Sequence, residues 1–252
     1  MQHQASPTVA CRSRRTLGAI TRMPSPVIVS LDFESSEEAL TLVERLGAEA
    51  DSYKIGLQLL TEAGPQVVRD LVSAGKHVFL DSKLHEIPNS VAGAVRAAGK
   101  LGVGVITVHA SAGSAVLRAA VAAAQAYPHL KVLGLTVITS LSDADLPEIG
   151  LAPSVKDQVL RLAGLATKSG CHGVVASAQE AAYLRSSLPT GALIVCPGIQ
   201  LSSVATDQAR TSSPRAAAQA GATHIVLGRA ITGAPEPLAV FRSAVQAFHN
   251  GA

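Results

Sequence analysis

The chain has 252 residues, of which 48% are hydrophobic and 15% are charged, and its formal net charge at neutral pH is +3. This apolar content is enough to build a full core, which excludes a chain that is disordered throughout. No run of about 18 uncharged apolar residues occurs, so we expect no membrane span.

Residues 1–22 form a polar, arginine-rich segment without acidic residues, and Met23 follows immediately before the first predicted strand. Spurious upstream translation, a disordered leader and an organelle transit peptide all share this composition. We expect residues 1–22 to be a disordered leader or a misassigned start, and residues 23–252 to be the folded domain. Without this segment the charge is close to neutral, which predicts no nucleic-acid partner.

From Val27 onward, short runs rich in β-branched residues alternate with longer amphipathic or alanine-rich segments, the pattern of repeated βα units. The predicted strands are Val27–Leu31, Ser52–Ile55, His77–Leu80, Val105–Val108, Lys131–Thr136, Gly173–Ala176, Leu193–Cys196 and His224–Leu227. The predicted helices are Ser36–Leu46, Gln66–Ala74, Asn89–Leu101, Ala112–Ala126, Ser154–Ser169, Ala178–Leu188, Pro214–Ala220 and Pro237–Phe248. Nearly continuous hydrophobic strands are typical of parallel strands buried on both faces. The pattern predicts the α/β class and a single (β/α)₈ TIM barrel, with a doubly wound open sheet as the alternative.

Active sites of such barrels lie at the carboxyl ends of the strands, so polar residues at those positions are candidates. They are Asp32, Lys54, Asp81, Lys83, His109, Thr139, Ser140, the Pro197-Gly198 pair and the Gly228-Arg229 pair. A lone histidine is more often structural than catalytic, and we interpret His109 in that way.

The segment from Phe79 to Ser90 carries the strongest local signal. Residues two apart in a strand point to the same side, so Asp81 and Lys83 should form an ion pair at the barrel mouth. An isolated pair of this kind is usually an ordinary salt bridge. Lys54 and Glu86, however, could join it in a cluster of four alternating charges. Such a cluster is costly to desolvate, which favours a catalytic role.

The loops after the seventh and eighth strands of such barrels commonly bind phosphate. Here they contain the turn from Cys196 to Gln200, then Gln208, and after the last strand Gly228 and Arg229. A guanidinium can grip a phosphate with two hydrogen bonds, which makes Arg229 the candidate. No metal-ligand spacing, dinucleotide fingerprint or P-loop is present, so we expect neither a metal nor a cofactor. Three scattered cysteines fit no disulfide framework and predict a reducing cytoplasm.

These residues resemble the orotidine 5'-phosphate decarboxylase family, whose signature DxKxxDIPNT is similar to the segment from Asp81 to Ser90. Further motifs fall in the family's order: Ser30-Leu-Asp32, Tyr53-Lys54-Ile-Gly, Val108-His-Ala-Ser111, Thr136-Val-Ile-Thr-Ser140, Pro197-Gly-Ile199, Asp207-Gln208 and Gly228-Arg229. The resemblance covers roughly Val27 to Phe248. It implies a barrel enzyme that converts orotidine 5'-phosphate to UMP in pyrimidine biosynthesis without a cofactor.

The resemblance also implies roles for single residues. Lys83 would donate the proton within a charged network of Lys54, Asp81, Lys83 and Glu86. The substrate-binding residues would be Asp32 and Lys54 at the ribose, Thr139 and Ser140 at the pyrimidine, Gln208, Gly228 and Arg229 at the phosphate, and in addition Ile87, Ser90 and Gln200. Glu86 and Ser90 would reach into the neighbouring subunit's site, which implies a homodimer with shared active sites.

Three positions depart from the family's pattern. Glu86 stands in place of an aspartate, Ser90 in place of a threonine, and Gln200 in place of the usual arginine. The phosphate site therefore has one charge fewer. Two alternatives stay open: a metal-dependent sugar-phosphate decarboxylase or aldolase of the same superfamily, and a non-catalytic protein that binds nucleotide phosphates.

Overall fold

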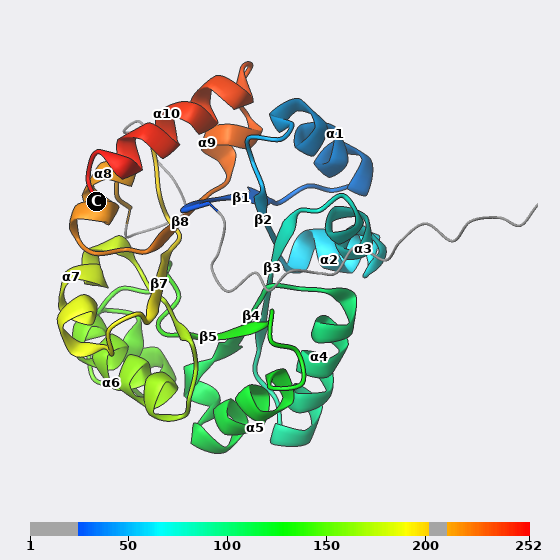
Figure 1. Cartoon of the computed structure of the whole chain (residues 1–252). Helices are drawn as coiled ribbons and strands as arrows, with labels where there is room; N and C mark the ends of the chain where they lie inside the picture. Colours follow the sequence, from blue (N-terminus) through cyan, green and yellow to red (C-terminus); the bar gives the residue numbers. More distant parts are fainter. Residues whose placement is uncertain (1–24, 202–210) are drawn as a thin grey trace, which may run out of the picture.

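The structure is a computed structural model that describes residues 25–201 and 211–252. Within them, parallel strands close into a barrel in sequence order, and the last strand pairs with the first (Figure 1). The strands are β1 (Val27–Leu31), β2 (Ser52–Ile55), β3 (His77–Leu84), β4 (Val105–His109), β5 (Lys131–Leu135), β6 (Gly173–Val175), β7 (Leu193–Cys196) and β8 (His224–Leu227). The predicted (β/α)₈ barrel is confirmed, and the open sheet is wrong because both of its edges would be unpaired.

Helices surround the barrel between successive strands (Figure 1). They are α1 (Ser36–Leu46), α2 (Leu57–Ala63), α3 (Gln66–Ser73), α4 (Pro88–Leu101), α5 (Ser114–Ala124), α6 (Val155–Lys168), α7 (Ala178–Ser187), α8 (Pro214–Gln219), α9 (Arg229–Thr232) and α10 (Pro237–His249). The sequence analysis missed α2, which lies between Gly56 and Gly64, and the single turn α9. Both helices are too short to show a helical period in the sequence, because α2 has seven residues and α9 has four.

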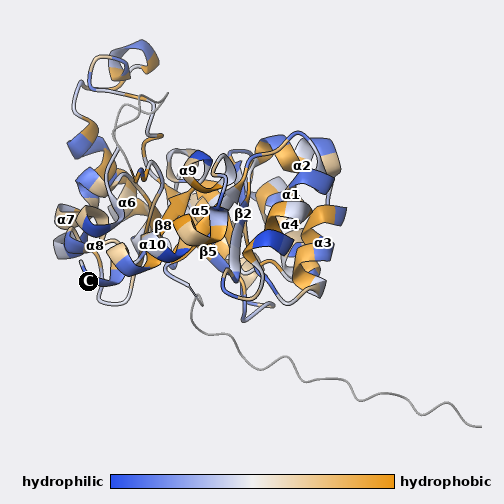
Figure 2. Ribbon diagram, turned by 90° about the horizontal axis from the view of Figure 1, so that it is seen from above, coloured by the Kyte–Doolittle hydropathy of each residue, from blue (hydrophilic) through white to orange (hydrophobic). Residues whose placement is uncertain are grey.

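The barrel has two apolar layers. Inside the ring of strands, alternate residues pack on one another: Ile28, Phe79, Val105, Leu133, Leu135, Val175, Val195 and Val226. The larger cluster lies between the outer faces of the strands and the helices, for example Val29, Tyr53 and Leu117, all fully buried. Figure 2 shows hydrophobic residues on the central strands and most hydrophilic residues on the outward faces of the helices. Both layers are closed because parallel strands bury both faces.

Strand β3 is longer than predicted and contains a bulge. It pairs with β4 at Leu80 and again at Leu84, opposite Ile106 and Val108. Three residues of β3 therefore face the single residue Thr107 of β4, and the pairing is irregular between the two contacts. A bulge bends its strand and re-aims the side chains. This bulge carries Asp81 and Lys83.

Candidate active site

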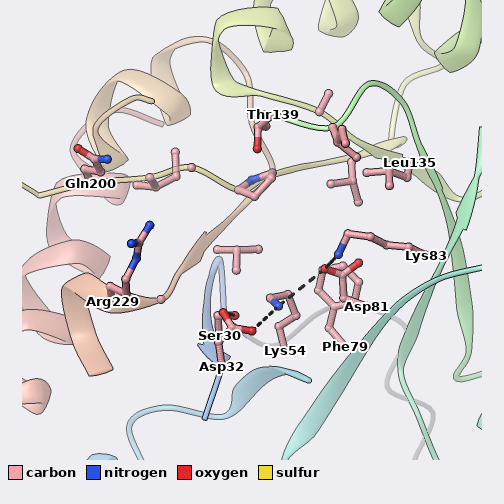
Figure 3. Close-up of a pocket in the computed structure, with 18 of the residues that line it drawn as sticks. Ser30, Asp32, Lys54, Phe79, Asp81, Lys83, Leu135, Thr139, Gln200 and Arg229 are labelled. Atoms are coloured by element: carbon pink, nitrogen blue, oxygen red, sulfur yellow. Dashed lines mark hydrogen bonds and ion pairs between the residues drawn. The ribbon is translucent and has the colours of Figure 1, made fainter. Parts of the chain in front are cut away.

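A cavity of about 700 Å³ opens at the carboxyl ends of the strands. Residues in or directly after every strand except β4 contribute to its wall, and Figure 3 shows 18 of the lining residues. Its lining comprises Ser30, Asp32, Lys54, Gln58, Phe79, Asp81, Lys83, Leu135, Val137, Ile138, Thr139, Val175, Ala176, Pro197, Gly198, Ile199, Gln200, Leu201, Val226, Gly228, Arg229 and Ala230. The cavity lies where barrel enzymes hold their substrates.

Strand alternation explains which side chains reach the cavity. Ile28 belongs to the packed barrel interior, and Ser30 and Asp32 follow it at intervals of two along the same side of the chain. On β3, Phe79 and Asp81 stand in the same relation. Apolar residues thus form the floor of the cavity, and charged residues stand on that floor at its mouth.

Four charged side chains of alternating sign lie in a row across the cavity. The Lys54 Nζ lies 3.2 Å from Asp32 Oδ1 and 3.7 Å from Asp81 Oδ2. Asp81 Oδ2 also accepts a hydrogen bond from the Lys83 Nζ at 2.6 Å. The order is therefore Asp32, Lys54, Asp81, Lys83, and each inner member has opposite charges on both sides. Figure 3 shows this row from β1 to β3.

The two inner members of the row are largely removed from water. The side chains of Lys54 and Asp81 keep only 12% and 11% of their surface exposed, whereas Lys83 keeps 33% and Asp32 49%. Taking charges out of water is costly even when they are paired. The more exposed ends of the row, Asp32 and Lys83, are the groups best placed to meet a ligand.

Small residues make room for the Asp32 end. The Ser30 hydroxyl donates a hydrogen bond to Asp32 Oδ2 at 2.6 Å, and Ser30 itself is buried. At Gly56, an added Cβ would stand 3.0 Å from both Asp32 Oδ1 and Lys54 Nζ. A glycine at this position therefore lets the ion pair approach the backbone.

A second polar end lies across the cavity from Lys83. Arg229, at the start of α9, and Gln200, after β7, lie there together (Figure 3). Gly198, in the turn between β7 and Gln200, has a φ of 76°, a conformation that favours glycine. Gly228 completes this wall beside Ser30 and Asp32. The cavity thus has an arginine at one end and the row of alternating charges at the other.

The remaining predicted residues divide between the cavity and the outer surface. Thr139 lines the cavity, whereas Ser140 is exposed and does not. Glu86 and Ile87, directly before α4, and Ser90, in its first turn, are exposed and lie outside the cavity of their own chain. Gln208 lies outside the described residues, as does its neighbour Asp207.

Glu86, just before α4, has defined hydrogen-bond partners despite its exposure. The Ser90 hydroxyl and then the Ile87 N–H donate hydrogen bonds to its carboxylate, and they hold the pKa of Glu86 below its usual range. Ile87 beside it keeps 62% of its surface exposed. The carboxylate is therefore ionised and held in place at the surface.

His109 ends β4 and does not line the cavity. Its ring stacks on that of His85, with 5.3 Å between the centroids. Burial, and then the neighbouring His85, lower the pKa of His109. The ring is therefore neutral near pH 7, in keeping with a structural role.

The sequence analysis predicted no site role for three residues around the charged row: Thr107 and Gln58, which it did not name, and Ser30, which it named only as part of a motif. Ser30 binds Asp32, Gln58 of α2 lines the cavity, and the fully buried Thr107 contacts both Asp81 and Lys83. Thr107 and Gln58 are common polar residues that belong to no motif. Only the polar character of Thr107 within an apolar strand could have drawn attention to it.

Among the residues that the structure describes, no group of three or more His, Cys, Asp or Glu side chains could hold a metal ion, and no helix is long and apolar enough to cross a membrane. The charged side chains of the cavity are instead arranged as acid–amine pairs. Such a costly row is a poor source of stability, so the fold and the cavity together indicate a (β/α)₈-barrel enzyme with its active site in this cavity.

Comparison with known proteins agrees with this class. The sequence model of the orotidine 5'-phosphate decarboxylase / HUMPS family matches residues 25–244. The chain is 43% identical to the orotidine 5'-phosphate decarboxylase of Chromobacterium violaceum, over 88% of this chain and 91% of that protein. It is 46% identical to that of Laribacter hongkongensis, over 85% and 89%. The crystal structure of the Lactobacillus acidophilus enzyme superposes with a TM-score of 0.80 at 34% identity, covering 89% of this chain and 99% of that one. The chain belongs to this family.

Proposed function

We infer that the protein is a carboxy-lyase that decarboxylates orotidine 5'-phosphate to UMP, the last step of pyrimidine nucleotide synthesis. Family membership and the match to named relatives over most of both chains support this activity. The observation that carries the chemistry is the Lys83 ammonium, 2.6 Å from the Asp81 carboxylate and facing the cavity. Of the two lysines in the row, Lys83 has the more exposed side chain.

The reaction needs an electric field and a proton at one carbon atom. Loss of CO₂ from C6 of the pyrimidine leaves an electron pair that no adjacent carbonyl delocalises. An ammonium beside C6 stabilises that charge and then supplies the proton, and Lys83 is the group for both tasks. Asp81 holds the ammonium in place. Its negative charge also repels the substrate carboxylate, and this repulsion is relieved when CO₂ leaves. Lys54 lies between Asp32 and Asp81 and separates their negative charges.

The rest of the substrate fits the other groups of the cavity. Asp32 and Lys54 would bind the ribose hydroxyls, and Thr139 with Ser140 would contact the pyrimidine. Arg229, with Gly228, Gln200 and Gln208, would bind the phosphate, because a guanidinium recognises phosphate oxygens in pairs. Binding energy at this remote end would stabilise the transition state at C6.

The exposed start of α4 is the proposed contact with a second copy of the chain. Glu86 is ionised and held by Ser90, yet it does not line its own cavity, and Ile87 presents apolar surface beside it. In a homodimer, Glu86, Ile87 and Ser90 would complete the partner's site next to Lys83. The compartment proposed is the reducing cytoplasm, which suits the buried free thiols of Cys171 and Cys196.

The test follows the ultraviolet absorbance of orotidine 5'-phosphate with purified protein in excess chelator. Loss of the orotate chromophore at a chelator-independent rate supports the decarboxylase. A rate that requires added divalent metal would favour the metal-dependent relatives instead. Tight binding without turnover would identify a nucleotide-phosphate binder, an outcome that the Glu86 and Gln200 departures make worth measuring.

A further inference from the structure

Thr107 lies beside the charged row but outside the lining of the cavity. It is in the middle of β4 and has no exposed surface. Its Oγ1 accepts a hydrogen bond from the Lys83 backbone N–H at 2.9 Å and donates one to Asp81 Oδ1 at 2.9 Å. One hydroxyl thus connects the backbone of the lysine to the carboxylate of the aspartate.

The bulge in β3 explains why this connection is needed. Asp81, Ser82 and Lys83 stand opposite Thr107 alone, so the regular ladder cannot pair their backbone groups. Lys83 has a φ of 47°, and of the described residues it is the one non-glycine residue with a positive φ. Backbone conformations of this kind persist only where surrounding contacts hold them. The Thr107 hydroxyl is the side-chain contact that holds the Lys83 N–H.

The same hydroxyl determines how Asp81 presents its two oxygens. Oδ1 is bound by Thr107, and this leaves Oδ2 for the Lys83 Nζ at 2.6 Å and the Lys54 Nζ at 3.7 Å. Without the hydroxyl, rotation about the Cβ–Cγ bond of Asp81 would exchange the oxygens. The Lys83 ammonium and the Asp81 carboxylate would then no longer be fixed relative to each other by a contact with β4.

We propose that Thr107 is a positioning residue for the decarboxylation: its hydroxyl holds the Lys83 backbone and the Asp81 carboxylate in one fixed geometry. This inference rests on the proposed function of Lys83 and Asp81. Thr107 does not line the cavity, so it acts only through these two residues. Because misplacement of a reacting group by about 1 Å can cost on the order of a hundredfold in rate, the hydroxyl should affect kcat far more than substrate binding.

The test compares Thr107→Val, which keeps the shape and loses both hydrogen bonds, with Thr107→Ser, which keeps the hydroxyl. We expect Thr107→Val to lower kcat between about tenfold and a hundredfold. The KM for orotidine 5'-phosphate and the Kd for UMP should change by less than about threefold, since the ribose and phosphate contacts remain. Thr107→Ser should keep most of the wild-type kcat. If Thr107→Val does not fold, Thr107→Ala carries the same prediction.

Thr223 provides the matched control at the other end of the barrel. Its Oγ1 likewise accepts a hydrogen bond from a backbone N–H and donates one to a carbonyl, both of Ile194, at 2.9 and 3.0 Å. Thr223→Val should lower the melting temperature without a matching loss of kcat. Unchanged kcat in Thr107→Val would overturn the inference, and so would a Thr107→Ser variant as slow as Thr107→Val. A wild-type protein without turnover would instead refute the proposed function itself.

Discussion

Lys83 combines a reactive group with an unusual backbone, and this makes it the most informative residue to change. Its ammonium contacts Asp81 and faces the cavity. We expect Lys83→Ala to abolish turnover with the fold intact, because one ammonium supplies both the field and the proton. Steady-state kinetics with circular dichroism measure this, with Lys168→Ala on the exposed end of α6 as control. A variant that keeps more than about a tenth of the wild-type kcat would contradict the role of Lys83.

Arg229 stands at the other end of the cavity, where Gln200 replaces the arginine usual in the family. Arg229 should therefore carry an unusually large share of phosphate recognition. A hydrogen bond to a charged group contributes about 1.5–3 kcal/mol, so Arg229→Ala should lower kcat/KM by at least about tenfold. The nucleoside orotidine has no phosphate, and on it the variant and the wild type should perform alike. Equal losses on both substrates would assign Arg229 to the fold or to the base site instead.

At the scale of elements, the alternation of strands and helices was readable from the sequence. Strands β1, β2, β7 and β8 and helix α1 begin and end at the predicted residues. The differences elsewhere have physical causes. The prediction ended β3 at Leu80 because the polar residues after it look like a loop, whereas the bulge lets the strand continue to Leu84.

Part of the candidate site could be predicted from the sequence, because the carboxyl ends of all strands meet at one side of a barrel. Asp32, Lys54, Asp81 and Lys83 were expected there, and the structure brings them into one row. The support from Thr107 was not readable, because it depends on the register between β3 and β4. No local sequence pattern encodes a three-against-one register, since the polar residues after Leu80 look like a loop in the sequence.

Strand β5 gives a test of the barrel interior. Leu133 is fully buried in the interior cluster and does not line the cavity. Leu133→Ala should reduce the free energy of unfolding by about 2–5 kcal/mol, since the closed ring of strands cannot collapse around the lost atoms. Urea denaturation measures this, and Arg118→Ala on the exposed face of α5 should stay within about 0.5 kcal/mol of the wild type. Comparable losses in the two variants would mean that Leu133 is not a core residue.

For the whole molecule, partly buried histidines link stability to pH. Burial is the largest cause that lowers the pKa of His77 and His109 in the folded state. The unfolded chain therefore binds more protons below its ordinary histidine pKa of about 6.5. Above that pH, these neutral rings make their full contribution to the free energy of unfolding. That contribution is lost as the pH falls through their lower folded pKa values.

Denaturation by urea at pH 7.5 and at about pH 5.5 measures this dependence. We expect a lower free energy of unfolding at the lower pH, because His77 is mostly buried and its Nδ1 has no hydrogen-bond partner. His77→Gln should flatten the profile, whereas His249→Gln at the end of α10 should not. A wild-type stability that is constant or rises over this interval would refute the linkage.

The largest scale is the proposed homodimer, in which Glu86 of each chain completes the other chain's site. Lys83→Ala and Glu86→Ala should each be inactive as homodimers. In a mixed dimer, the Glu86→Ala chain keeps its own Lys83 and receives Glu86 from its partner, so one of the two sites is whole. Random exchange of equal amounts should therefore restore up to about a quarter of the wild-type activity, since a two-fold dimer has two equivalent sites. The mixture is assayed after mild denaturation and refolding, with each variant treated alone as control. Because neither homodimer can contribute, activity in the mixture alone requires sites built from two chains, and its absence after demonstrated subunit exchange would leave Glu86 as a surface residue of a self-contained barrel.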